Sequence, residues 1–309
     1  MEAAVQVEKR VLWLKALRAP FIVASLIPLG IGASVAFLHL HSLDLLLLTL
    51  TVVGGASLHL STNMFNDYFD FKSGNDLAVR HQNPFAGGGR VLPTGIISPR
   101  AHFLVAFSLL LVGSLIGLYL FLLRGLLLLI IGLIGVVSLY FYVGPPLRLA
   151  YHGIGEFIVG LNFGPVIVLG TYLVQTGGIN LAAVLASIPV GLLVTAILWI
   201  NEFPDVEADL SVGKRTLMAR LGRKASIGVY EGLLVAAYAV TVVSVLLNFL
   251  PLIALLSLLS LPIGVKAAKH LRVHYEDPHA MIPANALTIL LLLVFGVLMI
   301  GAIFASVLL

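Results

Sequence analysis

The chain has 309 residues, of which 60% are hydrophobic and only 10% are charged, and it contains no cysteine. Because soluble domains carry about 25% charged residues, this composition excludes an ordinary soluble protein and indicates an integral membrane protein. The missing cysteines exclude disulfides, thiolate metal sites and a cysteine nucleophile. The net charge of +4 is expected from loops on one membrane face rather than from nucleic-acid binding, and we predict no nucleic-acid partner.

Residues 1–19 are basic and amphipathic, with no recognisable cleavable signal peptide, and we expect them to lie on the membrane surface. Nine apolar segments follow, each near the ~20 residues that a bilayer requires. In chain order they cover roughly 20–40, 43–71, 101–123, 125–143, 154–175, 181–204, 225–248, 250–267 and 284–308. The sequence therefore predicts an all-α, polytopic membrane protein with nine transmembrane helices.

The basic residues predict the orientation of these helices. With the N-terminus in the cytoplasm, 17 of the 18 Lys and Arg residues lie on the cytoplasmic side, and only Arg124 lies outside. Such asymmetry is typical of membrane proteins, and an error of one span would destroy it. We therefore predict a multi-pass protein of the cell membrane with a cytoplasmic N-terminus.

Two polar motifs interrupt the apolar pattern, at the cytoplasmic ends of the second and sixth predicted helices. The first is Asn66-Asp67-Tyr68-Phe69-Asp70, and the second is Asn201-Glu202-Phe203-Pro204-Asp205, which continues to Asp209. At 100° per residue, Asn63, Asn66, Asp67 and Asp70 share an arc of about 100°. Asn201, Asp205 and Asp209 follow an i, i+4, i+8 row, whereas Glu207 points to the opposite side.

Acidic residues on membrane helices are costly and usually functional. Two facing rows of carboxylates would repel each other unless cations lay between them, and carboxylate and amide oxygens are suitable ligands for Mg²⁺. Helix-end solvation would explain either motif alone, but poorly explains two on the same membrane face. A cation-coupled transporter is the other interpretation. Against it, the acids cluster at helix ends, and no acid lies near the middle of any other span.

Basic, glycine-containing loops follow both motifs. The first holds GGGRVLPTG with Arg90, and the second holds Gly213-Lys214-Arg215. Glycine permits close approach of a ligand, and Lys and Arg bind phosphate oxygens. Topogenic charge or lipid headgroup binding is the alternative, but we favour phosphate contact for Arg90, Lys214 and Arg215. A third polar cluster, from Tyr142 to Glu156 and including Arg148, could face a cavity or serve only as a turn and anchor.

These motifs together resemble one known group of proteins. NDYFDFKSGND, GGGRVL, YVGPPLRLAYHGIGE and DxxxDxxxGKRTLxxRLG resemble the UbiA superfamily of intramembrane prenyltransferases. The pattern is most similar to the menaquinone-pathway branch, the 1,4-dihydroxy-2-naphthoate polyprenyltransferases. The resemblance implies a single membrane domain over 1–309, with helices around a central cavity open to lipid and cap loops at about 72–100 and 205–224.

The resemblance also implies a reaction and its residues. A polyprenyl group passes from a prenyl diphosphate to an aromatic acceptor through an allylic carbocation, with Mg²⁺ as cofactor, membrane lipids around the chain and no obligate protein partner. The implied metal ligands are Asn66, Asp70, Asp76, Asp205 and Asp209, and the implied catalytic acids are Asp67, Asp70, Asp205 and Asp209. The implied substrate contacts are Asn63, Arg90, Arg148, Asn201, Lys214 and Arg215. Many family members carry a third acid in the first motif where this chain has Gly74, so Asp76 is the candidate substitute.

The acceptor stays open at this point. 1,4-Dihydroxy-2-naphthoate is our first choice, with 4-hydroxybenzoate and geranylgeranylglyceryl phosphate as alternatives within the same superfamily.

Overall fold

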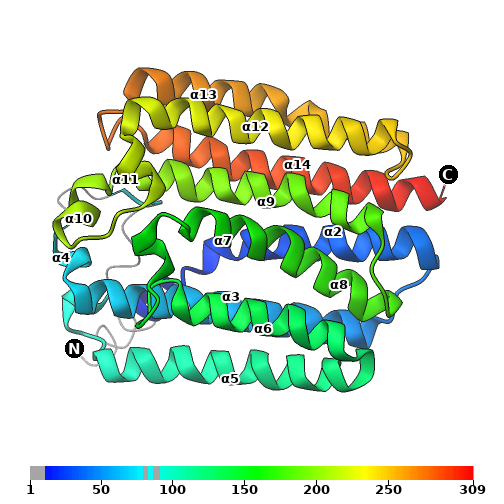
Figure 1. Cartoon of the computed structure of the whole chain (residues 1–309), viewed down its shortest axis with the longest axis horizontal. Coiled ribbons are helices and arrows are strands. Elements are labelled where there is room, and N and C mark those ends of the chain that lie inside the picture. Colours follow the sequence, from blue (N-terminus) through cyan, green and yellow to red (C-terminus); the bar gives the residue numbers. More distant parts are fainter. Residues whose placement is uncertain (1–10, 79–82, 86–90, 309) are drawn as a thin grey trace.

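The computed structural model describes residues 11–78, 83–85 and 91–308, and all regular elements within these ranges are helical (Figure 1). The long helices run side by side with their axes nearly parallel. They are α2 (Val23–Leu40), α3 (Leu45–Ser73), α5 (Pro99–Arg124), α6 (Leu126–Phe141), α9 (Leu181–Glu202), α12 (Arg223–Leu246), α13 (Leu261–His274) and α14 (Ile282–Leu308). The short helices α7 (Gly155–Leu161) and α8 (Ile167–Thr176) are joined by a π-helical turn, Asn162–Val166. The all-α prediction is confirmed for the described residues.

Each predicted apolar segment contains one helical stretch of the described chain. Eight stretches are long and apolar enough to cross a membrane, the first of them running from Val11 to Leu40. The ninth, α6, is apolar but has only 16 residues, or about 24 Å of helix, which is shorter than the ~30 Å hydrocarbon core of a bilayer. The protein is therefore membrane-embedded, while nine crossings and a cytoplasmic N-terminus stay predictions.

The boundary predicted for the eighth segment, 250–267, was wrong by seven residues at its end. A 3₁₀ stretch, Leu252–Ser260, leads directly into α13, which ends at His274. The last turns of α13 carry Lys266, Lys269 and Arg272, whose charge suggested a loop. Exposed basic side chains are compatible with a helix that extends beyond the apolar layer, because their stems lie along the helix while the charges reach water.

Local sequence signals fix most helix ends. Asp44 and Ser98 cap α3 and α5 by accepting backbone hydrogen bonds from Leu47 (3.0 Å) and Ala101 (3.2 Å), as expected for N-cap residues. The predicted break at Arg124-Gly125 is where α5 ends and α6 begins, and Gly125 has the positive φ of 85° that such a tight hairpin needs. The three short helices α4 (Asn75–Ala78), α10 (Val206–Ser211) and α11 (Leu217–Leu221) lie at one end of the bundle (Figure 1).

The main hydrophobic core joins α2, α8, α9, α12, α13 and α14, and smaller clusters join α3 to α5 and α6. Small residues allow the tightest contact. A Cβ atom built on Gly191 of α9 would lie 2.6 Å from the carbonyl oxygen of Gly160, and one built on Gly164 would lie 2.7 Å from that of Ser187. Close helix approach through glycine is typical of membrane bundles. It holds the π-helical turn against α9.

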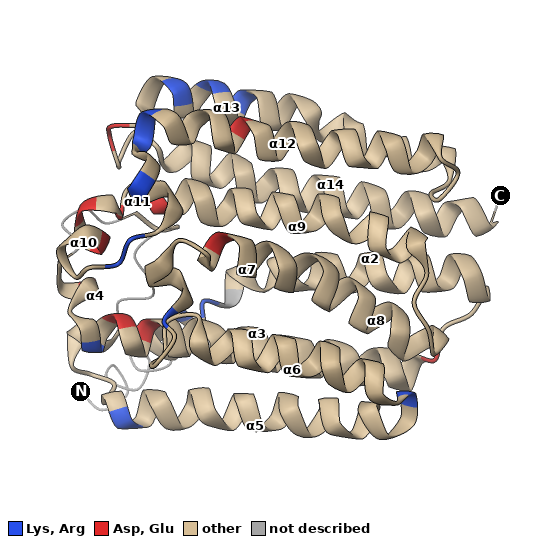
Figure 2. Cartoon of the chain, viewed as in Figure 1, with Lys and Arg blue, Asp and Glu red and all other residues tan. Residues whose placement is uncertain are grey.

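Charged residues concentrate at the same end of the bundle as the short helices (Figure 2). At the opposite end lie Asp44, which caps α3, and Arg124, whose Nε donates to the carbonyl of Val174 at 2.6 Å. Both acidic motifs therefore lie at one end of the molecule, as the sequence predicts. The side of the membrane that this end faces is not determined by the structure and stays a prediction.

The contact between α9 and the π-helical turn predicts a large penalty for one added methyl group. Gly191→Ala should lower the stability of the folded protein by about 1–3 kcal/mol, because both neighbouring groups are backbone and cannot yield. Gly232→Ala on α12, where a Cβ atom meets nothing within 4 Å, is the matched control. Thermal unfolding in detergent checks this, and equal melting temperatures for the two variants would contradict the close packing.

Candidate active site

The two acidic motifs meet at the charged end of the bundle. The last turns of α3 carry Asn66 and Asp70, and α4 continues with Asn75 and Asp76. Across from them, α9 ends at Glu202, Asp205 precedes α10, and Asp209 lies within α10. Asp70, Asp76, Glu202 and Asp209 are each at least nine-tenths buried. Buried carboxylates require counter-charges or ligands.

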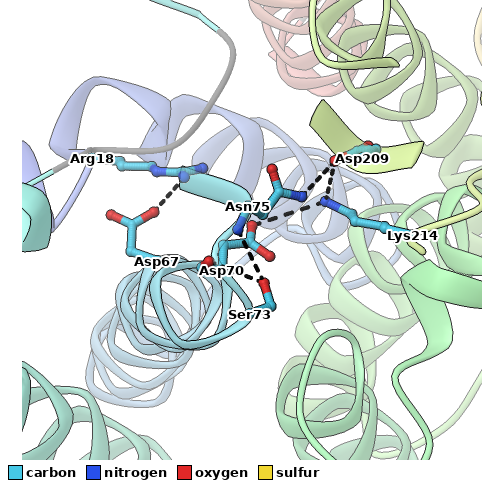
Figure 3. Close-up of polar contacts among 7 residues, drawn as sticks. All are labelled: Arg18, Asp67, Asp70, Ser73, Asn75, Asp209 and Lys214. Atoms are coloured by element: carbon cyan, nitrogen blue, oxygen red, sulfur yellow. Dashed lines mark hydrogen bonds and ion pairs between the residues drawn. The ribbon is translucent and has the colours of Figure 1, made fainter. Parts of the chain in front are cut away.

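Lys214 joins the motifs. Its Nζ lies 3.3 Å from Asp209 Oδ1 and 3.9 Å from Asp70 Oδ2 (Figure 3). Asn75 adds a second link by donating from Nδ2 to Asp209 Oδ1 at 2.7 Å. The helix faces expected from the sequence thus converge, and a single ammonium group lies between an acid of the first motif and an acid of the second.

The electrostatics of Lys214 follow from this position. Burial alone would lower its pKa, but the carboxylates of Asp209 and Asp70 outweigh burial and raise the pKa well above its usual value. The side chain therefore stays charged at neutral pH. A lysine with a raised pKa contributes stability that is fully present at neutral pH and is lost only as the pH rises through its value in the folded protein.

Asp67 belongs to the same motif but has a different partner. Its Oδ1 accepts a hydrogen bond from Arg18, and its side chain is 2% exposed. Arg18 lies in the turn before α2 with a left-handed φ of 49°, and its side chain reaches Asp67 of α3. Figure 3 shows Asp67 directed toward Arg18 and Asp70 directed toward Lys214. Sequence reasoning assigned Arg18 only a topogenic role and missed this contact.

The asparagines predicted to contact substrate are held by protein groups. Asn63 donates from Nδ2 to the carbonyl of Leu17 at 3.3 Å. Asn201 Oδ1 accepts from Nδ2 of Asn285 on α14 at 2.7 Å, and Asn285 Oδ1 in turn accepts from Asn83 at 3.3 Å. Asn285 therefore positions the start of the second motif.

The arginines that the sequence predicts to contact substrate do not all lie at the acidic cluster. Arg90 lies outside the described residues. Arg148 is exposed, and its guanidinium lies 5.5 Å from the Tyr151 ring centroid. Arg215 is also exposed, but its backbone N–H donates to Tyr151 at 3.3 Å, which joins the 142–156 loop to the second cap loop. Glu207 lies away from the site and pairs with Arg223 at 2.6 Å.

The oxygens of the motifs suit a divalent cation. Asn66 Oδ1 and Asp70 Oδ1 are buried and have no hydrogen-bond partner among the residues that the structure describes, and hard oxygen atoms of this kind are the ligands that Mg²⁺ takes. No group of three or more His, Asp or Glu side chains in the described part of the chain is arranged to hold a metal. The oxygen-bearing residue types still fit Mg²⁺. In this structure the ammonium of Lys214 lies between Asp70 and Asp209.

Two adjoining cavities extend from this end into the bundle along α3. The nearer one, about 140 Å³, is lined by six residues with hydrogen-bonding side chains together with apolar ones. The farther one, about 460 Å³, is lined mainly by Leu, Ile, Val and Gly of α3, α5, α6 and α8. Gly55, Leu58 and Gly135 line both. A chamber of this composition suits a hydrocarbon chain.

Tyr142 connects the nearer cavity to the acidic cluster. It lines the cavity and lies near the carboxylates of Glu202 and Glu156. Its phenol can donate a hydrogen bond. Glu156 is itself fixed by accepting from the backbone N–H of Leu217 at 2.6 Å.

Comparison with known proteins gives the family. A sequence profile of the UbiA prenyltransferase family matches residues 25–281. The chain belongs to the UbiA prenyltransferase family. It is therefore a prenyltransferase, as the motifs predict, and its long apolar helices are those of a membrane-embedded enzyme of this family.

Two UbiA-family relatives are 1,4-dihydroxy-2-naphthoate octaprenyltransferase of Bacillus subtilis and 2-carboxy-1,4-naphthoquinone phytyltransferase of Synechocystis. The first is 32% identical over 89% of this chain and 86% of the relative, and the second is 30% identical over 94% and 92%. A solved UbiA homologue from Archaeoglobus fulgidus, bound to DMAPP and Mg²⁺, shares the fold with a TM-score of 0.65. It is 15% identical, with 94% of this chain and 99% of that chain covered.

The position of Lys214 between two acids predicts how its removal would change the stability of this UbiA-family protein. Lys214→Met should lower the free energy of unfolding by about 3–5 kcal/mol, because it leaves buried carboxylates without their cation. Millimolar Mg²⁺ should restore part of the melting temperature, since a ligand that binds only the folded state stabilises it. Arg215→Met, at an exposed position, is the control. A Lys214→Met variant as stable as this control would contradict the proposed charge balance.

Proposed function

We propose that this chain transfers a polyprenyl group from a prenyl diphosphate to an aromatic acceptor, with 1,4-dihydroxy-2-naphthoate as the leading candidate. The observation that carries the proposal is the convergence of two buried acidic motifs and one lysine at the end of an apolar chamber. A charged diphosphate suits the first part, and a hydrocarbon chain suits the second.

Magnesium is the proposed cofactor. Asn66, Asp70, Asp205 and Asp209 would hold it, with Asp76 as a further ligand, and the bound ion would neutralise charge on the diphosphate. The solved A. fulgidus homologue bound to DMAPP and Mg²⁺ supports this choice. The buried, unpartnered oxygens of Asn66 and Asp70 support it independently.

Lys214 has two roles in this proposal. Without substrate its ammonium balances Asp70 and Asp209; when the acids acquire a divalent cation, the ammonium turns to the diphosphate oxygens. Arg215 and Arg90 contribute further positive charge from the cap loops, and Arg148 is a peripheral contact. Asp67 acts through Arg18, which it holds beside the donor site. Asn63 and Asn201 keep the ends of the two motifs in place.

Positive charge at the diphosphate promotes cleavage of the bond between the allylic carbon and oxygen, with both electrons leaving on the diphosphate. The allylic cation then lies where the chamber walls exclude water, which would otherwise capture it. A ring carbon of the acceptor attacks it. For a dihydroxynaphthoate the carboxylate leaves as CO₂.

The naphthoate acceptor is supported by the names of the two relatives at 30–32% identity. 4-Hydroxybenzoate and geranylgeranylglyceryl phosphate are the alternative acceptors within the family. We further propose nine membrane crossings with the N-terminus and the active site on the cytoplasmic side of the cell membrane. The basic residues of the loops support that orientation.

A panel of acceptors tests the proposal. Purified protein in lipid nanodiscs, given Mg²⁺ and geranylgeranyl diphosphate, should prenylate 1,4-dihydroxy-2-naphthoate and release diphosphate. Asp70→Ala and Asp209→Ala should each lower kcat/KM by about 10²–10³-fold, as expected for loss of a group that stabilises developing charge. Glu207→Ala, which removes an acid 70% exposed at its side chain, should leave the rate unchanged.

Two results would contradict this proposal in different ways. Transfer to glyceryl phosphate but not to the naphthoate would exclude the acceptor while leaving the family reaction intact. Release of diphosphate that is unaffected by Asp70→Ala and Asp209→Ala would exclude the acidic motifs as the donor site.

A further inference from the structure

The wall of the nearer cavity contains polar side chains, which a hydrocarbon chain would not require. Side chains with hydrogen-bonding groups project into it from four segments, namely Ser25, His59, Thr62, Ser138, Tyr142 and Asn162. Thr62, Ser138 and Asn162 donate to backbone carbonyls of their own helices at 2.6–2.8 Å, and each keeps an oxygen that can accept a hydrogen bond from a ligand. The 460 Å³ chamber beyond is larger, and a smaller share of its lining residues, Thr51, Ser114 and Thr171, carry hydrogen-bonding side chains, so it suits the prenyl chain better. The nearer cavity therefore suits a second ligand with polar groups.

Charge and shape narrow the class of this ligand. None of the described residues that line the cavity is Lys, Arg, Asp or Glu, which excludes a diphosphate. Three rings, those of His59, Tyr142 and Phe163, lie along it, and aromatic walls favour a flat aromatic ligand. The π-helical turn Asn162–Val166 brings Asn162 and Phe163 to the wall, and such turns are frequent at functional sites.

His59 is a titratable side chain of this wall, and one of its two ring nitrogens is free to bond a ligand. Its Nδ1 is 2.5 Å from the hydroxyl of Ser25, and both residues are buried. The Phe163 ring meets it edge to face at a centroid distance of 5.3 Å. The ring is thereby held from two sides. Its Nε2 has no hydrogen-bond partner among the described residues.

The position of His59 along α3 would place an aromatic ligand next to the prenyl diphosphate. His59 precedes Asn66 by seven residues, or about 10 Å along the helix axis. An aromatic ring bound against His59 would therefore extend toward the acidic cluster, where the allylic carbon of the donor would lie. Tyr142 closes the same cavity on the side of Lys214 and Glu202.

We propose that the nearer cavity binds the hydroxylated aromatic acceptor, and that His59, oriented by Ser25, accepts the proton of an acceptor hydroxyl through Nε2. This inference rests on the proposed function and adds a catalytic residue that neither acidic motif contains. A histidine oriented by a second hydrogen bond is a common general base.

The proton balance is complete without a further reagent. As a ring carbon bonds to the allylic carbon, the hydroxyl oxygen becomes a ketone and its proton moves to His59 Nε2. The alkylated carbon then loses its proton to the released diphosphate, or its carboxylate as CO₂, and those electrons restore the aromatic ring. The oxygen takes the proton back from His59, which returns to its neutral form.

The test combines a change in the protein with a change in the acceptor. Wild type and His59→Phe, in nanodiscs with Mg²⁺ and geranylgeranyl diphosphate, are given 1,4-dihydroxy-2-naphthoate and its two mono-O-methyl ethers. His59→Phe should lower kcat/KM for the parent acceptor by about 10²-fold, the lower end of general-base contributions. One ether should be about equally poor with wild type, and His59→Phe should no longer distinguish that ether from the parent.

Two further variants serve as controls. His39→Phe removes a histidine with similar contacts at an exposed position, since His39 Nδ1 lies 2.9 Å from the Tyr172 hydroxyl and the two rings meet edge to face. It lies outside both cavities and should transfer at the wild-type rate. Ser25→Ala should cost about tenfold in kcat/KM for the acceptor, because the imidazole loses its orientation. It keeps the test available if His59→Phe does not fold.

Binding of the donor distinguishes a failure of the His59 proposal from a failure of the proposed function. The Kd for geranylgeranyl thiolodiphosphate with Mg²⁺ should be the same for wild type, His59→Phe and Ser25→Ala. If wild type transfers to the naphthoate and His59→Phe matches His39→Phe, this inference is wrong and the proposed function stands. An equal penalty for the ether in wild type and His59→Phe would also overturn it. If wild type prenylates no acceptor, the proposed function fails, and the inference fails with it.

Discussion

The arrangement of the charged end depends on one interaction, the ammonium of Lys214 between Asp209 and Asp70. A bundle of apolar helices keeps several buried carboxylates ionised only if positive charge is buried with them. Lys214 comes from a loop that follows α10, so its placement also fixes that loop over the end of α3. The fold of the cap and the charge balance of the site are therefore one constraint.

The same constraint explains why the site can respond to substrate. A lysine is a flexible point charge, whereas a divalent cation with a diphosphate is a larger and more demanding set of charges. The exchange proposed above would keep the acids neutralised throughout. Arg18 provides a separate and more rigid pairing for Asp67, which leaves Asp70 as the acid of that motif directed toward the exchange (Figure 3).

The sequence contains much of this arrangement. Helical periodicity predicts that Asp70 shares one helix face with Asn63, Asn66 and Asp67, and the asymmetry of basic residues predicts that both motifs share one end of the molecule. Other features depend on tertiary contacts that periodicity does not encode. The Arg18–Asp67 pair involves a left-handed residue in the turn before α2, and the place of Asn285 beside Asn201 depends on how α14 packs on α9. The π-helical turn contains Pro165, which has no N–H to continue an α-helical pattern, but its exact register is set by the glycine contact with α9.

The most direct test of this account is the position of the metal. Crystals grown with Mn²⁺ and a non-hydrolysable prenyl thiolodiphosphate would locate the ion by its anomalous scattering. The account predicts Mn²⁺ bound by oxygens of Asp70 or Asp209, with Lys214 Nζ moved from between them to the diphosphate. Mn²⁺ bound elsewhere, with Lys214 still paired to both acids, would contradict it.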